Sequence, residues 1–486
     1  MGIVFDEKTG KGVGFTKHRS SENHYNACLT ICLRPTCETL WLRDSLQKIL
    51  VPFIEMCLMT SPLWQRSIST VSFLSFFAWT AIANSEENWN RFHGPKGQGD
   101  AGSANLPSEW TDQDYSWKRD IGSRDVGSPI IIDGKVYYLA YRSDKRQLSL
   151  ESLELSSGKL RWSRPFPQVE YHLHSRNTFA SGTPSADEKN IFVAYAEPEH
   201  TYLKCFDHSG NELWSRDFGS WQSQHGFGTS PRIHGEVVLL FNSQQADQLR
   251  PGQTPGVSRI IAVDRNSGQD VWETELTTTR SCYGMPAVYQ GGKRPQVINA
   301  NTGDGMFGLD LKTGEKIWNL EVFEKRVCST PLIHGDIAIG TSGSGGGGNH
   351  LVAVRIPKSA GDKPEQLYRI DRGAPYVPTP AIRGDRMYMV DDKGIASCID
   401  IETGDSLWME RIGGRGGFGA SPILIGDKLL IISLGGEATV LKASDDFKVL
   451  GEMDLGGPVG ASPAFASGCL LLRVGNELRC LGGKSI

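Results

Sequence analysis

Short apolar runs, separated by glycine turns, recur along the chain at nearly constant spacing. Each run follows a small residue (once a methionine) and a proline, as in "PIIIDGKVYYLA" and "PLIHGDIAIG". Proline is tolerated at the first residue of a strand because it need not donate to the ladder there. Each repeating unit therefore predicts four short strands. The residues that precede the eight prolines are Ser128, Thr183, Ser230, Met285, Thr330, Thr379, Ser421 and Ser462.

A second pattern closes most units: an extended segment, a turn with glycine, and a second extended segment that ends on tryptophan. "LDLKTGEKIW", from Leu309 to Trp318, is one copy. Glycine adopts the positive φ of such a turn at no steric cost. In one unit Tyr368 replaces the indole, and another, "VLKASDDFKVL", has no glycine. We expect the indoles to pack between neighbouring blades rather than to bind a ligand. They are Trp117, Trp162, Trp214, Trp272, Trp318 and Trp408.

Four-stranded repeats of this length are typical of a β-propeller. The prolines lie 41 to 55 residues apart, and eight of them imply eight blades. The last unit stops after three strands, whereas an unassigned strand from Tyr115 to Gly122 precedes the first. We predict an all-β, eight-bladed propeller over residues 115–486. The N-terminal strand completes the last blade, so that no sheet edge is left open.

The first hundred residues or so differ from the repeats. Arg66, an apolar stretch and Ala81-Ile82-Ala83 predict a signal peptide over residues 66–83. The alternative, a transmembrane anchor, is less favoured because the stretch is short for a bilayer. Residues 1–65 are then an extension, either disordered or the product of a misassigned start. We call residues 84–114 the lead-in segment. The predicted product is a monomer, exported to the periplasm or secreted, with no membrane span after cleavage.

Charge and cysteine content narrow the chemistry. The formal net charge is −4 and no basic stripe appears, so a nucleic-acid partner is not expected. His172 and His174 have the spacing of metal ligands on a strand, but no third ligand accompanies them, and no metal site is predicted. Cys469 and Cys480 flank one predicted hairpin, either bridged or as two buried thiols.

The loops that lead into the innermost strands converge at the channel mouth of a propeller, where ligands usually bind. In this chain they carry cations and aromatic residues, which suit an anionic or sugar-like ligand or an acidic peptide. Alternatively, the aromatic residues fill the channel and the arginines pair with neighbours such as Asp125. The candidate binding residues are Arg124, Arg176, His225, Arg280, Tyr283, Arg326, Tyr376, Arg415 and Phe418.

The "D-x-x-T-G-x-x-x-W" block, present in five near-complete copies, the eightfold recurrence of the repeat unit and the lead-in sequence "NWNRFHGPKGQG" resemble the PQQ-like (pyrroloquinoline quinone repeat) β-propeller family, over about residues 88 to 486. The resemblance implies one of two functions. Quinoprotein dehydrogenases hold PQQ and Ca²⁺ over the channel, and the alcohol-oxidising members carry adjacent, disulfide-bonded cysteines. The BamB-like branch keeps the repeats without the cofactor.

This chain has no Cys-Cys dipeptide and no local cluster of Asp, Glu and Asn for Ca²⁺. The expected function is therefore a non-catalytic binding or scaffolding module for a protein or a cell-envelope glycan, without a cofactor. The alternatives are a PQQ- and Ca²⁺-dependent dehydrogenase that oxidises alcohols or sugars, and an enzyme of another class that uses the channel mouth. Because fold does not imply function, this choice rests on the resemblance.

Overall fold

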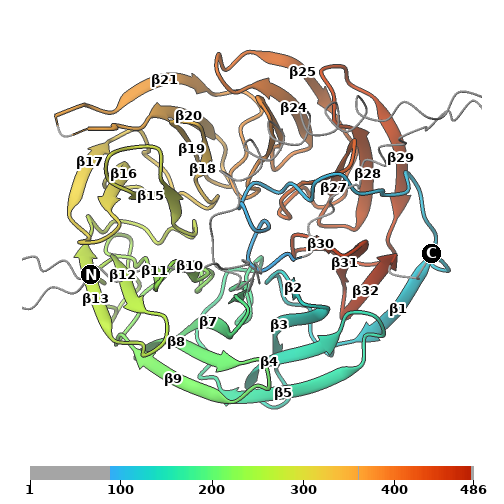
Figure 1. Cartoon of the computed structure of the whole chain (residues 1–486), viewed down its shortest axis with the longest axis horizontal. Helices are drawn as coiled ribbons and strands as arrows, with labels where there is room; N and C mark the ends of the chain where they lie inside the picture. The colour runs from blue at the N-terminus through green and yellow to red at the C-terminus, as the bar shows by residue number, and fades with distance from the viewer. Residues whose placement is uncertain (1–87, 360, 483–486) are drawn as a thin grey trace, which may run out of the picture. The chain divides into compact units, whose positions relative to one another are not determined.

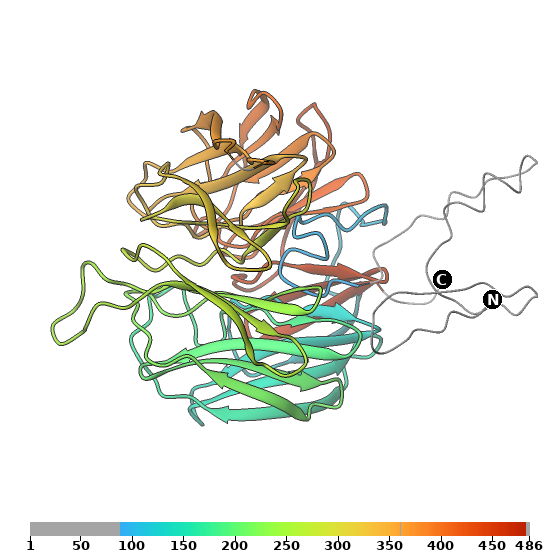
Figure 2. The ribbon, with the colours of Figure 1, turned by 60° about the vertical axis from the view of Figure 1, so that its left-hand side comes forward.

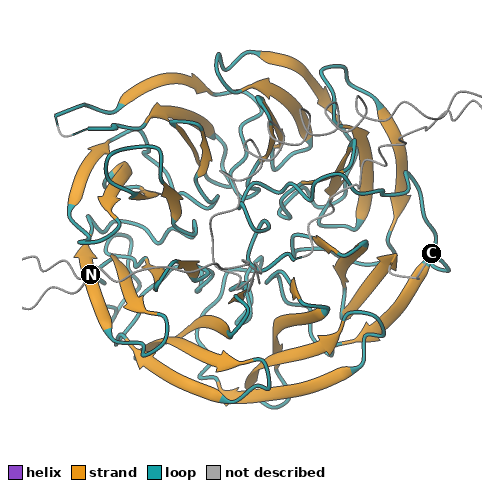
Figure 3. Ribbon diagram, viewed as in Figure 1, coloured by secondary structure: helices purple, strands orange, loops and turns teal. Residues whose placement is uncertain are grey.

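The computed structural model describes residues 88–359 and 361–482, whose regular elements are all strands (Figure 3). The strands form eight four-stranded antiparallel sheets, arranged around a channel as the blades of a propeller (Figure 1). The predicted all-β, eight-bladed architecture is confirmed. No helix of the described residues is long and apolar enough to cross a membrane. The predicted extension (1–65) and signal peptide (66–83) lie outside the described residues.

The first four blades follow each other along the chain, each from its inner to its outer strand. Blade one contains β2 (Ile130–Ile132), β3 (Lys135–Arg142), β4 (Gln147–Glu154) and β5 (Leu160–Pro167). Blade two contains β6 (Ser185–Ala186), β7 (Asn190–Glu197), β8 (His200–Asp207) and β9 (Glu212–Asp217). Blade three contains β10 (Arg232–His234), β11 (Val237–Asn242), β12 (Arg259–Asp264) and β13 (Asp270–Glu275). Blade four contains β14 (Ala287–Tyr289), β15 (Gln296–Asn301), β16 (Gly305–Asp310) and β17 (Lys316–Leu320).

The last four blades complete the ring. Blade five contains β18 (Leu332–His334), β19 (Ile337–Ser342), β20 (His350–Arg355) and β21 (Glu365–Ile370). Blade six contains β22 (Ala381–Arg383), β23 (Arg386–Val390), β24 (Ile395–Asp400) and β25 (Ser406–Arg411). Blade seven contains β26 (Ile423–Ile425), β27 (Lys428–Ile432), β28 (Glu437–Lys442) and β29 (Val449–Asp454). Blade eight contains β30 (Ala464–Ala466), β31 (Cys469–Val474), β32 (Glu477–Gly482) and β1 (Tyr115–Asp120).

Strand β1 closes the ring, as predicted. It pairs antiparallel with β32, and Trp117 lies opposite Cys480 in the register. The outer strand of the last blade is therefore supplied by the start of the repeat region. Because both ends of the propeller share one sheet, its backbone groups are paired and no open blade edge remains at the junction.

A buried ion pair adds to this closure. Arg473 on β31 donates one Nη2 hydrogen bond to Asp125, at 2.9 Å, and another to Ser123. Its Nη1 donates to the carbonyls of Gly127 and Leu139 in blade one. The side chains of Arg473 and Asp125 are only 1% and 4% exposed, so the pair is desolvated. Asp125 thus pairs with Arg473 of the last blade, and not with the adjacent Arg124.

The repeated tryptophans connect each blade to the next. Trp272 of β13 donates its indole N–H to the Leu311 carbonyl of blade four, at 3.0 Å. Its ring covers the turn glycine of that blade: a Cβ on Gly314 would lie 2.5 Å from the indole. The turn glycine is therefore required twice, for its φ of +75° and for the close approach of the ring. The same contact recurs in the pairs Trp117–Gly158, Trp162–Gly210 and Trp214–Gly268.

The degenerate repeats change this contact in ways that their sequences explain. Tyr368 covers Gly404 and donates its hydroxyl to the Ile401 carbonyl, at 2.8 Å, so tyrosine replaces the indole. Trp318 donates to Gln296 Oε1 of its own blade, and the loop glycine of blade five, Gly361, has nothing within 4 Å of a Cβ. Trp408 donates to the Ser444 carbonyl of blade seven, whose turn lacks glycine.

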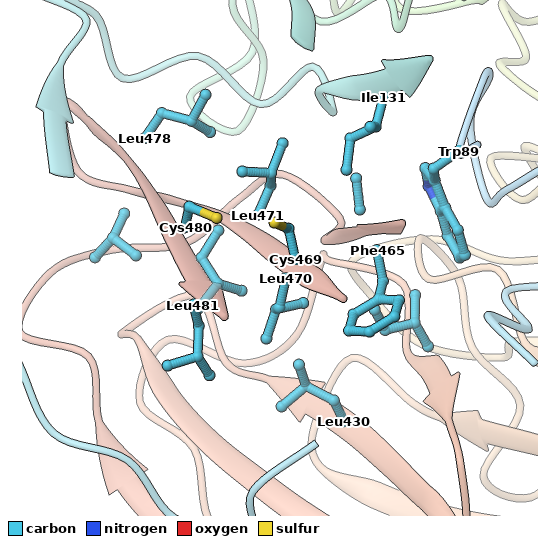
Figure 4. Packing of buried hydrophobic residues seen from close by; sticks show 14 of the residues in the cluster. Trp89, Ile131, Leu430, Phe465, Cys469, Leu470, Leu471, Leu478, Cys480 and Leu481 are labelled. Atoms are coloured by element: carbon cyan, nitrogen blue, oxygen red, sulfur yellow. The ribbon is translucent and has the colours of Figure 1, made fainter. Parts of the chain in front are cut away.

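The lead-in segment, described from residue 88, crosses the channel (Figure 1). Trp89 exchanges two backbone hydrogen bonds with Ile131 of β2, and it is fully buried beside that strand (Figure 4). Further along, the carbonyls of Asn90, Gln98 and Gly99 accept N–H groups of the inner strands of blades two, six and seven. The segment therefore closes one end of the channel, which the sequence pattern alone does not predict.

Two further features, the predicted cysteine pair and a long insertion, have a place in the fold. Cys469 and Cys480 are buried free thiols on one face of neighbouring strands β31 and β32 (Figure 4). They are diagonal rather than directly opposed, since Cys469 faces Gly482 and Cys480 faces Leu471. The long polar insertion between β11 and β12 projects from the propeller as a yellow-green loop (Figure 2).

We predict that Gly314→Ala destabilises the propeller far more than Gly134→Ala. Both glycines have similar φ angles, +75° and +68°, so both variants carry left-handed backbone strain of about 1–2 kcal/mol. Of these two glycines, Gly314 lies under an indole, whereas nothing lies within 4 Å of a Cβ on Gly134. Steric overlap should cost Gly314→Ala about 1–3 kcal/mol more. Urea unfolding curves measure the difference, and equal losses would contradict the docking contact.

Replacing Arg473 with methionine should lower the free energy of unfolding by about 3–5 kcal/mol, because Asp125 stays buried without its cation. The double variant Arg473→Met/Asp125→Asn removes both charges, and we expect it to recover part of the loss. The amide oxygen of the introduced asparagine can still accept the Tyr141 N–H that Asp125 accepts now. Thermal unfolding of the two variants and the wild type tests this. A double variant as unstable as the single one would show that packing, and not charge, holds the closure.

Candidate functional site

The channel contains a cavity of about 680 Å³ on the side of the loops that lead into the inner strands. The residue before each of the eight prolines lines its wall, and seven of these residues carry a hydroxyl. Phe92 of the lead-in segment also lines it. Because that segment crosses the channel, the cavity is a blind pocket. We call it the channel pocket.

The hydroxyls of this wall form a belt that joins the blades. In each link, a backbone N–H donates to the side-chain oxygen of the corresponding residue in the next blade. Thr379 N donates to Ser421 Oγ at 2.9 Å, for example, and Ser421 N to Ser462 Oγ at 2.8 Å. Met285 cannot accept such a bond from Ser230. These hydrogen bonds explain why serine or threonine precedes seven of the eight prolines. The other links run Ser128–Thr183, Thr183–Ser230, Met285–Thr330 and Thr330–Thr379.

Arg326 is the most enclosed charge of the pocket wall, at 6% exposure. It sits in the loop before β18, where its Nε donates to the Ser281 carbonyl at 2.8 Å. Its two remaining nitrogens lie 3.5 Å from the Tyr376 hydroxyl and 3.4 Å from Gln224 Oε1. These partners are neutral groups, so the charge of Arg326 is held in place without a carboxylate.

The pocket wall carries more positive than negative charge. Arg176, Arg326 and Lys393 face a single carboxylate, Asp392. Burial raises the pKa of Asp392, although its Oδ2 accepts the Tyr376 N–H at 2.7 Å. Such a wall favours an anion with hydrogen-bonding groups.

Two histidines complete this wall, with ring centroids 4.8 Å apart. Burial, followed by the nearby Arg326 and His174, lowers the pKa of His225 to about 4. Burial and Arg176 lower the pKa of His174 in the same direction. Both rings are therefore neutral near pH 7, able to donate and accept hydrogen bonds without adding charge.

The structure brings together five of the nine residues that the sequence suggested. Arg176, His225, Tyr283, Arg326 and Tyr376 all line the channel pocket. The others lie elsewhere. Arg124 is exposed, Arg280 lies near Asp247 at 3.8 Å, and Arg415 forms ion pairs with Glu437 and Asp454. Phe418 is buried in the core of blades six and seven.

Several pocket residues are not suggested by the loops alone. Asp392 and Lys393 come from the turn between β23 and β24, and Asn349 from the glycine-rich loop between β19 and β20. Turns between the second and third strands lie on the same side of a blade as the loops into the first strand. That topological rule is the signal that would have found them. His172 lies outside the pocket wall, and no group of three or more His, Cys, Asp or Glu in the described residues is placed to hold a metal.

The fold is an eight-bladed β-propeller with a pocket in its channel. The family model described as "Outer membrane protein assembly factor BamB" matches residues 256–445, from the end of the projecting loop to blade seven. Over these residues, which are less than half of the chain, the sequence is similar to the BamB-like family of PQQ-repeat propellers. No curated protein matches the chain in sequence.

Solved structures with the same fold have different functions. BamB from Moraxella catarrhalis is 14% identical, with a TM-score of 0.53 over 76% of this chain and 99% of its own. A europium-containing methanol dehydrogenase is 12% identical, with a TM-score of 0.55 over 79% and 89%. The computationally designed Ika8 protein is 11% identical, with a TM-score of 0.54 over 74% and 97%. At these identities the likeness shows the fold alone.

The described wall of the channel pocket does not supply the ligands that the Ca²⁺ of the dehydrogenase branch requires. Ca²⁺ takes about six to eight oxygen ligands, usually with several carboxylates. Asp392 is the one carboxylate of the described wall, and it is already bonded to Tyr376. No two cysteines are adjacent in the sequence, whereas the resemblance implies such a pair in the alcohol-oxidising members. The described wall is suited to binding an anion rather than to holding a metal ion.

We predict that acid destabilises the propeller between about pH 6.5 and pH 4. Burial lowers the pKa of the fully buried His93, as it does that of His225, to about 4. The unfolded chain takes up these protons near pH 6.5 and the folded chain only near pH 4, so the free energy of unfolding falls as pH drops through this window. His93 alone should contribute roughly 2 kcal/mol between pH 7 and pH 5.

Urea unfolding at pH 7 and pH 5 measures this loss in the wild type and in His93→Gln. Glutamine can still donate to the Pro422 carbonyl, which His93 Nε2 now contacts at 2.9 Å, but it cannot be protonated. The variant should therefore lose less stability than the wild type on acidification. His172→Gln, at an exposed position, is the control. Identical losses in His93→Gln and the wild type would contradict the assignment.

Proposed function

We propose that the chain is an exported, non-catalytic recognition module whose channel pocket binds a carboxylated sugar unit of a cell-envelope glycan. The blind, hydroxyl-lined pocket with its excess of positive charge is the observation that carries this proposal. A glycan unit offers both groups that the wall would recognise, a negative charge and several hydroxyls. The size of the cavity, about 680 Å³, suits one or two sugar rings better than a folded partner.

The charges supply the affinity for the anion. Arg176 is exposed at the pocket mouth and its side chain has no ion pair with the described residues, so it is free to meet an incoming carboxylate. Arg326 lies deeper, already oriented by the Ser281 carbonyl. A guanidinium that is held in place loses less entropy when it binds, and its planar fork matches a carboxylate.

The neutral groups would set specificity. Seven belt hydroxyls, Asn177 and Asn349 surround the space with donors and acceptors that match sugar hydroxyls. Tyr283 and Tyr376 add aromatic surface, and burial raises the pKa of both phenols, so they act as uncharged hydrogen-bonding groups.

Export is proposed from the signal-peptide pattern over residues 66–83, and the match of residues 256–445 to the BamB family model is consistent with it. A second candidate partner, a protein, has support from the polar loop between β11 and β12 that projects from the propeller (Figure 2). The pocket favours the glycan, because a cavity of this kind accepts a small group and not an extended surface.

Titration calorimetry of the purified protein with N-acetylmuramic acid and with N-acetylglucosamine tests the proposal. The two sugars differ by a lactyl carboxylate, so only the first should bind appreciably. Arg176→Gln should weaken binding roughly ten- to hundredfold, the range for loss of a charge-assisted hydrogen bond. Arg415→Gln, whose side chain pairs with Glu437 and Asp454 outside the pocket, is the matched control and should bind like the wild type.

Equal affinity for both sugars, or no difference between Arg176→Gln and Arg415→Gln, would remove the pocket as the recognition site. The dehydrogenase alternative is measured in the same samples with PQQ and Ca²⁺, followed by dye-linked oxidation of alcohols and sugars. Calcium-dependent PQQ binding with turnover would overturn the non-catalytic assignment.

A further inference from the structure

Two arginines and a histidine lie at the channel end that the lead-in segment covers. Arg232 is the first residue of the inner strand β10 and is 8% exposed. Its Nη1 lies beside Gly97 of the lead-in segment, 3.6 Å from where a Cβ would be. Arg91 comes from the same segment, and His234 ends β10. None of the three residues lines the channel pocket, so this group is separate from the site above.

Arg232 lacks a partner for its charge within the described part of the chain. Its Nε is buried without a hydrogen bond, and no described carboxylate forms an ion pair with it. Burial, and then the neighbouring Arg91, hold the pKa of Arg232 well below its usual range. Burial also lowers the pKa of Arg91 to about 10. A buried cation next to a second cation is strongly unfavourable unless a counter-charge is present.

Other buried arginines of the same propeller show what a satisfied guanidinium looks like. Arg473 makes four hydrogen bonds, one of them to Asp125. Arg326 has three neutral partners. Arg232 replaces the apolar or small residue that the other blades place directly after the proline, such as Ile130, Ala381 or Ile423. The chain therefore buries a charge at a position where the fold requires none.

We propose that Arg91, Arg232 and His234 form an oxyanion site that binds one phosphate or carboxylate group at the covered end of the channel. The bound group neutralises the two guanidinium ions, and it accepts the hydrogen bonds that Arg232 now lacks. Arg91 and His234 are half-buried, so they form the solvent-side wall through which an ion enters. A single oxyanion fills such a gap, since each guanidinium offers a planar fork to two oxygens.

Titration of the full chain with inorganic phosphate, and separately with acetate, tests the site by calorimetry and by thermal unfolding. Chloride at matched ionic strength controls for general screening. Phosphate should raise the melting temperature of the wild type beyond chloride, because it binds the folded state. Arg232→Met should remove the part of this response that remains in Arg176→Gln, with a loss of affinity of roughly tenfold or more. Tighter binding of phosphate or of acetate identifies the natural oxyanion, and either result supports the site.

The stability of Arg232→Met in the absence of added anion gives a second test. Without added anion it should be at least as stable as the wild type, because it removes an uncompensated buried charge. Arg91→Gln, at a half-buried position, should weaken phosphate binding while Arg232 is kept. Arg176→Gln should leave this site intact, so a failure here is distinguished from a failure of the channel pocket. Equal phosphate responses in Arg232→Met and the wild type, or a strongly destabilised Arg232→Met, would overturn the proposal.

Discussion

Closure of the ring by β1 and β32 is the constraint on which the rest of the structure depends. A blade contacts only its two neighbours, so the position of each blade is set around the whole circle. The pairing of Trp117 with Cys480, together with the buried Arg473–Asp125 pair, fixes the last gap. The lead-in segment leads directly into β1, and its path across the channel therefore depends on the same closure (Figure 1). Without this closure of the ring, neither the floor of the channel pocket nor the wall around Arg232 would have a fixed position.

The residues that recur from blade to blade stabilise the ring, whereas the charged residues of the candidate sites lie at positions that depart from the repeat. Two contacts recur between neighbouring blades. A tryptophan ring packs on a turn glycine at the outer rim, and a backbone N–H donates to a side-chain hydroxyl beside the channel. The belt hydroxyls also face the pocket, so a structural device supplies the neutral part of the site. The charged residues do not belong to the repeated pattern. Arg176 and Arg326 lie in loops of unequal length, and Asp392 lies in a turn. Arg232 occupies a position that is apolar or small in the other blades. Function is therefore expected where the eightfold pattern is broken.

The sequence alone predicts the fold well and the site in part. Proline and glycine marks are local, so blade number, strand order and the role of β1 follow from spacing. Arg176 and Arg326 could be placed near the channel mouth for the same reason. Spacing does not say which way a loop turns, however, and Arg124 and Arg415 point to solvent while Phe418 enters the core. The path of residues 88–102 could not be predicted, because it rests on backbone hydrogen bonds that leave no periodic trace. Arg232 is visible in the sequence as a charged residue directly after Pro231. A search for apolar runs passes over it.

The proposed function depends above all on recognition of an anion in the channel pocket by Arg176 and Arg326. The most direct measurement is a crystal structure of the protein soaked in selenate, with the anion located by its anomalous scattering. We expect a selenium peak inside the pocket, with oxygens within hydrogen-bond distance of both guanidinium groups. Anion peaks confined to the outer surface, with the pocket free of them at saturating selenate, would contradict it.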